Sequence, residues 1–234
     1  MQLDLSKLSY SHNDIKREIK IPEYLDEDLA FLMGLHLGDG NIFSKSHDIN
    51  YTGNLYEEYN WYITWILPLL KKKFNIMFKI HHDTRPKRES IRIRTRSKVI
   101  FTFYTQVLML PPGKKDSCGI PYMIMRAPKN IQKAFLRGYI DTDFCLTFTR
   151  RKKGGLNKYP KIILNTNNQQ LCKDTVLLLQ EMGYIPYFRY NFYRPRYDQP
   201  LFSNEINING KEQLEKWMRE IGFSSPKHFT KYYI

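Results

Sequence analysis

Two nine-residue stretches decide the fold of this chain: residues 32–40 (LMGLHLGDG) and residues 136–144 (LRGYIDTDF). Each is an apolar, helix-like run with glycine at its third position and a carboxylate at its eighth. A glycine inside a helix costs roughly 1 kcal/mol relative to alanine, so both glycines need a physical reason. One such run could arise by chance, but two at matching places in two similar halves indicate a shared structural role.

Small residues recur four positions after the glycines, at Gly38 and Thr142, and so share a helix face with them. That spacing lets two helix backbones approach closely. If the two runs pack through these faces, Asp39 and Asp143 lie side by side at two helix C-termini. The helix dipole and mutual repulsion disfavour this pairing, and a bound divalent cation would resolve the conflict. The alternative is that the aspartates are solvated C-cap residues and the glycines ordinary helix stops.

Composition points to a structured nucleic-acid binder. The chain of 234 residues has 37 Lys plus Arg against 23 Asp plus Glu, giving a net charge of +14, with 42% hydrophobic residues. A basic folded surface favours nucleic acid first and an anionic membrane second. No run approaches the ~18 apolar residues of a spanning helix. Three isolated cysteines indicate neither a zinc site nor a disulfide framework, and no signal-peptide core is present, so we expect an intracellular protein.

The same order of elements follows each motif. In the first half we expect strands at 41–45, 48–54, 76–82 and 90–96, with helices at 56–73 and 97–110. In the second half the corresponding strands are 145–151, 161–166, 184–192 and 202–208, with helices at 168–182 and 211–221. The sequence therefore predicts an α+β protein of two αββαββα halves, residues 1–115 and 129–234, joined by a linker at 116–128.

Residues 91–96 (IRIRTR) alternate in a way that separates a buried face from an open one. With a side-chain period of two, the isoleucines face the helices and Arg92, Arg94 and Arg96 line the open sheet face. Residues 205–209 repeat the pattern with Asn207 and Asn209. Arginine and asparagine can bond bidentately to guanine and adenine in the major groove. The remaining predicted DNA contacts are Arg85, Lys87, Arg88, Arg189 and Asn191.

Aromatic and basic residues interleave in residues 187–196 (YFRYNFYRPR). This stretch could stack unpaired bases, as RNA binders do, or follow phosphates along a duplex. We favour the second interpretation.

The two motifs resemble LAGLIDADG, the signature of homing endonucleases, in the form in which one chain carries two copies. The resemblance covers nearly the whole chain after about Tyr24. It implies two saddle-shaped antiparallel sheets, with the motif helices packed at the central interface. It also implies a monomer that grips a long, asymmetric DNA duplex.

The resemblance further implies that Asp39 and Asp143 are the catalytic metal ligands, each serving one strand. The backbone carbonyls of Gly38 and Thr142 complete a half-open site for Mg²⁺, with Mn²⁺ able to substitute. In this family a basic residue near the last strand of each half often approaches the metal-bound water. Two lysines that start equivalent helices are the predicted catalytic partners: Lys98 and Lys211.

Two departures from the motif affect these expectations. Leu37 replaces an aspartate that is not the ligand, and this is tolerable. Phe144 replaces the final glycine; we expect it to forbid a left-handed backbone there and to weaken the second site.

The predicted function is site-specific cleavage of double-stranded DNA by an intron-encoded endonuclease. The alternatives are an RNA maturase that binds intron RNA and a DNA-binding protein that does not cleave. The chain begins with Met and lacks the C-terminal His-Asn of an intein, so we expect a free-standing protein in the cytoplasm or an organelle.

Overall fold

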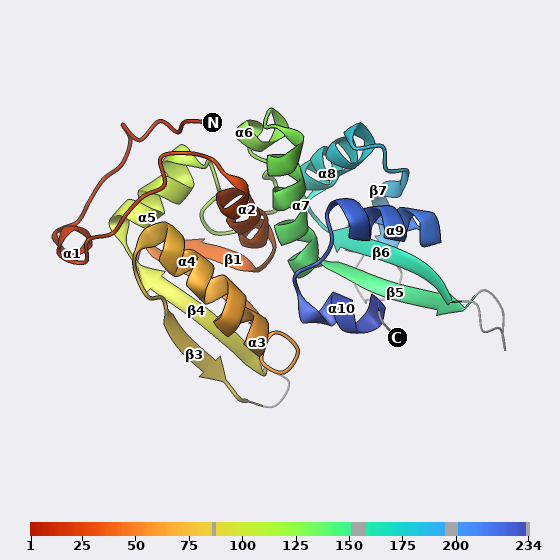
Figure 1. Cartoon of the computed structure of the whole chain (residues 1–234), viewed down its shortest axis with the longest axis horizontal. Helices are drawn as coiled ribbons and strands as arrows, with labels where there is room; N and C mark the ends of the chain where they lie inside the picture. The colour runs from red at the N-terminus through yellow and green to blue at the C-terminus, as the bar shows by residue number, and fades with distance from the viewer. Residues whose placement is uncertain (86–87, 151–157, 195–200, 233–234) are drawn as a thin grey trace.

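A computed structural model describes residues 1–85, 88–150, 158–194 and 201–232. Within these residues, two four-stranded antiparallel sheets flank a central pair of helices, α2 (Glu27–Asp39) and α7 (Lys129–Asp143) (Figure 1). The strand order is β1-β2-β4-β3 in the first sheet and β5-β6-β8-β7 in the second. The two sheets thus share one topology, and the predicted α+β class of two similar halves is confirmed.

The first half contains, in order, β1 (Gly40–Phe43), β2 (Asp48–Asn54), a continuous helix made of α3 (Tyr59–Trp61), η1 (Tyr62–Ile66) and α4 (Leu67–Phe74), β3 (Lys79–Asp83), β4 (Ser90–Arg96), and a last helix made of α5 (Lys98–Thr102) and η2 (Phe103–Val107). The second half contains β5 (Phe144–Arg150), β6 (Lys158–Thr166), α8 (Gln169–Glu181), β7 (Pro186–Arg194), β8 (Leu201–Asn209) and α9 (Lys211–Glu220).

Three short helices were not expected from the sequence: α1 (His12–Lys16), α6 (Tyr122–Met125) and α10 (Pro226–Tyr232). None of the helices in the described part of the chain combines the length and the apolar character needed to cross a bilayer. The division at residues 116–128 stays a prediction.

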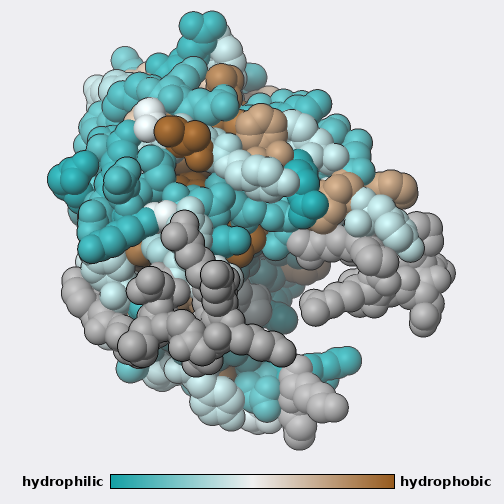
Figure 2. Space-filling model, turned by 90° about the vertical axis from the view of Figure 1, so that its right-hand side faces the viewer, coloured by the Kyte–Doolittle hydropathy of each residue, from teal (hydrophilic) through white to brown (hydrophobic). Residues whose placement is uncertain are grey.

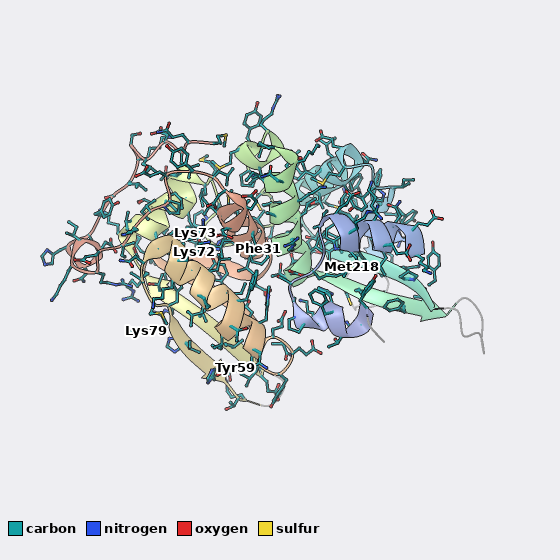
Figure 3. The ribbon with its side chains drawn as sticks, in the orientation of Figure 1. Phe31, Tyr59, Lys72, Lys73, Lys79 and Met218 are labelled. Atoms are coloured by element: carbon teal, nitrogen blue, oxygen red, sulfur yellow. The ribbon has the colours of Figure 1, made fainter. Side chains whose placement is uncertain are left out.

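The two central helices touch through their backbones. A Cβ atom placed on Gly34 would lie 2.0 Å from the carbonyl oxygen of Phe135, and one placed on Gly138 would lie 2.1 Å from that of Phe31. Figure 3 marks Phe31 on α2. Only glycine fits at either position, because the obstructing atoms belong to the backbone of the other helix. The predicted packing of the motif helices through their small faces is confirmed.

The start of α2 is fixed by charge as well as by a cap. The Asp26 side chain accepts a hydrogen bond from the Leu29 N–H, 2.9 Å away, as an N-cap does. Two lysines near the end of α4 (Figure 3) reach the same helix terminus, where Lys72 pairs with Asp28 at 2.6 Å and Lys73 pairs with Asp26. These pairs join α4, which lies over the first sheet, to the central helix.

The sheets bury one face each, as the alternation predicts. Ile91 and Ile93 of β4 are fully buried, whereas Arg92 and Arg96 are exposed. In the second sheet, Ile206 is fully buried beneath α8 and α9. The outer surface of this half is mostly hydrophilic, with scattered apolar residues (Figure 2).

Replacing Gly34 with alanine should lower the free energy of unfolding by about 3 kcal/mol, the upper range for overpacking, because a backbone cannot move aside as a side chain can. Denaturant unfolding measures this change. The control is Gln180→Ala on the exposed face of α8, which should stay within about 0.5 kcal/mol of the wild type. A Gly34→Ala variant as stable as this control would contradict the close helix contact.

Candidate active site between the central helices

The packed helices bring their last residues, Asp39 and Asp143, together. A Cβ atom placed on Gly38 would lie 3.2 Å from Oδ1 of Asp143, so this carboxylate lies against the end of α2. Burial and then the charge of Glu58 raise the pKa of Asp39 to about 7, although a hydrogen bond from the Tyr62 hydroxyl, at 2.8 Å, opposes the rise. Asp143 is more open to solvent, yet the surrounding protein atoms still raise its pKa by desolvation.

Two lysines that the sequence analysis missed lie at these helix ends. The Lys115 ammonium donates to four backbone carbonyls around the end of α2, those of His36, Leu37, Gly38 and Gly40, at 2.6–3.1 Å. The Lys227 ammonium donates to the Thr142 carbonyl at the end of α7, at 2.8 Å. Their charges oppose the rise in the pKa of Asp143. Lys115 follows α5 and η2, and Lys227 follows the corresponding helix α9, a shared position in the repeat that could have revealed both.

The expectation that Lys98 and Lys211 approach the aspartates is wrong. Lys98 comes two residues after Arg96, the last residue of β4. Arg96 is in register with Asp48 on β2, and Asp48 is in register with Phe43, which is the end of β1 far from Asp39. The Lys211 side chain is 82% exposed and pairs with Glu215 at 3.6 Å, on the same helix. The strand register therefore places both helix starts several residues along the sheet from the motif ends.

Asp141 fixes the segment that carries Lys227. Its buried carboxylate accepts hydrogen bonds from the Ser224 N–H at 2.9 Å and from the Ser224 hydroxyl at 2.5 Å. Burial raises the pKa of Asp141 to about 6, and these hydrogen bonds limit the rise. In the first motif Leu37 occupies the matching position and is buried as an apolar residue.

The oxygen donors at the helix ends suit a hard divalent cation. Mg²⁺ binds through one or two carboxylates and keeps waters, and Asp39 and Asp143 supply that number. The described residues contain no cluster of three or more His, Cys, Asp or Glu side chains able to hold a metal. In this structure the carbonyls of Gly38 and Thr142 accept N–H groups from lysines. The residues thus fit a cation at this end of the helices. The negative ends of the two helix dipoles also favour a positive charge there.

The open face of the first sheet carries the predicted arginines. Asp48 accepts hydrogen bonds from both Arg94 and Arg96, at 3.1–3.3 Å. Burial alone would raise the pKa of Asp48, but these bonds hold it below its ordinary value. Arg17, from the segment after α1, donates to the Arg96 carbonyl at 2.8 Å and joins this face without having been predicted. Arg92 is also exposed, and its Nε donates to the hydroxyl of Thr52 on β2, at 3.4 Å.

The other predicted DNA contacts differ in placement. Arg85 pairs with Asp83 and Arg88 is exposed, whereas Lys87 lies outside the described residues. In the second sheet, Arg189 pairs with Glu205 at 2.7 Å.

The asparagines of the second sheet do not all reach the surface. Asn191 is exposed at a bulge of β7. Asn207 is on the face predicted but is only 6% exposed, and its amide donates to Glu205. Asn209 is half-buried. Asn207 therefore lies on the predicted face but is covered by neighbouring side chains, and its contact with DNA stays a prediction.

Comparison with known proteins agrees with this geometry. The family model for a LAGLIDADG-like domain matches residues 130–222. Homing endonuclease I-DmoI, solved with DNA and Ca, superposes with a TM-score of 0.58 at 14% identity, covering 89% of this chain and 98% of that chain. The I-LtrWI LAGLIDADG homing endonuclease bound to target DNA gives 0.53 at 12% identity, over 89% and 88% of the two chains. This is a two-motif chain of the LAGLIDADG fold.

A segment of similar sequence occurs within a longer curated relative. The replication factor C small subunit of Methanocaldococcus jannaschii is 28% identical over 206 residues. The aligned region covers 88% of this chain and 10% of that relative, so the chain spans about a tenth of the relative's length.

Phe144, the departure in the second LAGLIDADG motif, causes no backbone strain. Gly40 has φ −81° and Phe144 has φ −93°, so both motifs end in extended backbone. Gly40 is needed for another reason: a Cβ there would lie 2.3 Å from the His36 ring. Ile140 occupies the matching place in the second motif, and the buried Phe144 ring packs edge-on against Tyr139. The expected prohibition of a left-handed backbone is thus wrong, since neither motif uses one.

Replacing Lys115 with methionine should lower the free energy of unfolding by about 2 kcal/mol, the value of hydrogen bonds to a charged group. The change leaves the carbonyls at the end of α2 without the ammonium that donates to them and removes one of the two cations near Asp143. The matched control is Lys114→Met, because Lys114 is the exposed neighbour. Equal denaturation midpoints for the two variants would argue against this cap.

Proposed function

We propose that this chain is a site-specific endonuclease that cuts both strands of a DNA duplex with a divalent metal, Mg²⁺ or Mn²⁺. We further propose that it acts as a monomer and is encoded within an intron. The observation that carries the proposal is the convergence of Asp39 and Asp143 at the ends of two touching helices, with Lys115 and Lys227 beside them. Two solved proteins of the same fold, I-DmoI and I-LtrWI, are in complex with DNA, which supports the choice of substrate.

The two sheets supply binding in this proposal. A net charge of +14 favours a polyanion, and arginines on the open face of β4 can contact phosphates or guanine edges. Asp48 orients Arg94 and Arg96 through paired hydrogen bonds, so these side chains are held ready before DNA arrives. The active site lies between the sheets, and a duplex lying across both would pass the helix ends.

Phosphodiester hydrolysis needs an activated water and neutralisation of the charge on the phosphoryl group. A bound divalent metal supplies both when held by Asp39 and Asp143. Lys115 and Lys227 add two positive charges beside these carboxylates, where they can attract a phosphate and offset its charge. Tyr62 holds one Asp39 oxygen by its hydroxyl and so orients that carboxylate.

A DNA-binding protein that does not cleave is the alternative that one observation favours. The carbonyls expected to help bind the metal accept lysine N–H groups in this structure. The solved relatives give no support to intron RNA as a partner. The two remaining functions separate when the protein is incubated with Mg²⁺ and DNA carrying the uninterrupted insertion site of its own intron.

Asp39→Asn and Asp143→Asn should each abolish double-strand cutting while leaving DNA binding largely intact, because phosphate contacts do not depend on these carboxylates. Nicking of one strand by either variant is compatible with the proposal. Strand-labelled cleavage assays and gel-shift titrations measure both properties. Full double-strand cutting by either variant, or binding without any cutting by the wild type, would reject the nuclease assignment.

Replacing Arg92, Arg94 and Arg96 together with alanine should weaken binding to the target. A residue that reads a base should account for about 1–3 kcal/mol and for preference at one position, whereas a phosphate contact should weaken all sequences and flatten the salt dependence. Binding isotherms at several salt concentrations distinguish the two cases. The control is Lys129→Ala, a half-exposed lysine at the start of α7. Unchanged affinity of the triple variant would exclude this face.

A further inference from the structure

Glu58 links the first half to the lysine of the second. Glu58 immediately precedes α3, and its side chain is 6% exposed. One carboxylate oxygen, Oε2, accepts a hydrogen bond from the Asn54 N–H at 2.8 Å. The other, Oε1, lies 3.1 Å from the ammonium of Lys227 on α10. Glu58 therefore has one oxygen fixed by its own half and the other directed at the opposite half.

Asn168 makes the reverse link. It precedes α8 in the second half, and its Oδ1 caps that helix by accepting from the Leu171 N–H at 3.0 Å. Its Nδ2 donates to the carbonyls of Lys115 at 2.5 Å and Cys118 at 2.7 Å. These two bonds hold the backbone of the segment that carries Lys115 against the second half.

The two residues occupy the same place in the repeat. Each follows the second strand of its half, β2 or β6, and stands directly before the long helix. Both are buried, Glu58 at 5% and Asn168 at 4% exposure. The side chains of Glu58 and Asn168 thus reach across the central interface in opposite directions. Each contacts a segment of the other half that carries a lysine.

A lysine needs such a partner to hold one position. Its strongly hydrated ammonium sits on a flexible four-carbon stem, so without a fixed partner it would sample many positions. Lys227 makes only one hydrogen bond to a backbone carbonyl among the described contacts, and the buried Glu58 carboxylate supplies a second, charged partner. The Lys115 ammonium has four carbonyl partners. Asn168 holds the Lys115 backbone, the starting point from which the side chain reaches those carbonyls.

We propose that Glu58 and Asn168 are positioning residues that hold the active-site lysine of the opposite half, so that each half completes the site of the other. This inference rests on the proposed nuclease function only for its effect on cutting. The placement of the lysines can be tested without DNA or metal.

The first test is the reactivity of Lys227 toward an N-hydroxysuccinimide ester, followed by peptide mass spectrometry on the whole chain. Glu58→Gln keeps an acceptor for the Asn54 N–H but loses the charge. We expect Lys227 to react about tenfold faster in this variant, because its ammonium loses the ion pair with Oε1 of Glu58. The matched control is Glu57→Gln, an exposed neighbour with the same charge change. Equal Lys227 reactivity in the two variants overturns the role of Glu58.

Asn168→Asp tests the reverse link. Aspartate is as good an N-cap as asparagine, so α8 keeps its cap while the two hydrogen bonds donated by the amide are lost. Lys115 should then react faster by at least the same factor, about tenfold. Asn167→Asp adds the same charge at an exposed neighbouring position and should leave Lys115 protected. A protected Lys115 in Asn168→Asp overturns this half of the inference.

Cutting rates then show whether position matters for chemistry. Single-turnover rates are compared for Glu58→Gln, Lys227→Met and the double variant. If Glu58 acts through Lys227, the double variant cuts no more slowly than Lys227→Met alone. Two effects that multiply would mean that Glu58 acts on cutting by another route, and this would overturn the inference. A wild-type protein that does not cut would reject the proposed function, while the reactivity of the lysines would still decide whether they are positioned.

Discussion

The contact between the backbones of α2 and α7 is the constraint on which the rest of the molecule depends. Gly34 and Gly138 leave no side chain between the helices at these positions, so the two backbones are in direct contact. Because the helices run side by side to their C-terminal ends, two carboxylates and two negative dipole ends are forced into one place. The arrangement is electrostatically unfavourable by itself, and it is tolerated because cations can enter it.

The lysines show how the protein manages that charge without a metal. Lys115 is largely buried, and burial lowers its pKa, while Asp143 and then Asp39 act in the opposite direction. A buried ammonium is stable there because four carbonyls replace its hydration. The carbonyl oxygens that hold the ammonium, together with the carboxylates near it, are suited to a hard cation, so an ammonium group and a metal would use some of the same donors.

The sequence predicted features set by local periodicity and missed those set by the path of loops. The small helix faces of Gly34 and Gly138 and the alternation of Ile91 and Arg92 follow from side-chain periods of 3.6 and 2, which a sequence shows directly. Lys98 was placed wrongly because the strand register, not the order of elements, decides which end of the sheet a helix start occupies. Phe144 was judged by the backbone conformation that glycine would allow. The matching residue, Gly40, is instead required because a side chain there would clash with the ring of His36, four residues earlier.

The two halves share a backbone plan but differ in how they use acids on the sheet. In the first sheet Asp48 holds Arg94 and Arg96 in place, and the face remains cationic. In the second sheet Glu205 binds Arg189 and the Asn207 amide, so one acid there holds a cationic and a neutral side chain. A duplex lying across both faces would meet unlike surfaces at its two ends. The two sheets therefore differ in how their acids are used, although their strand orders are the same.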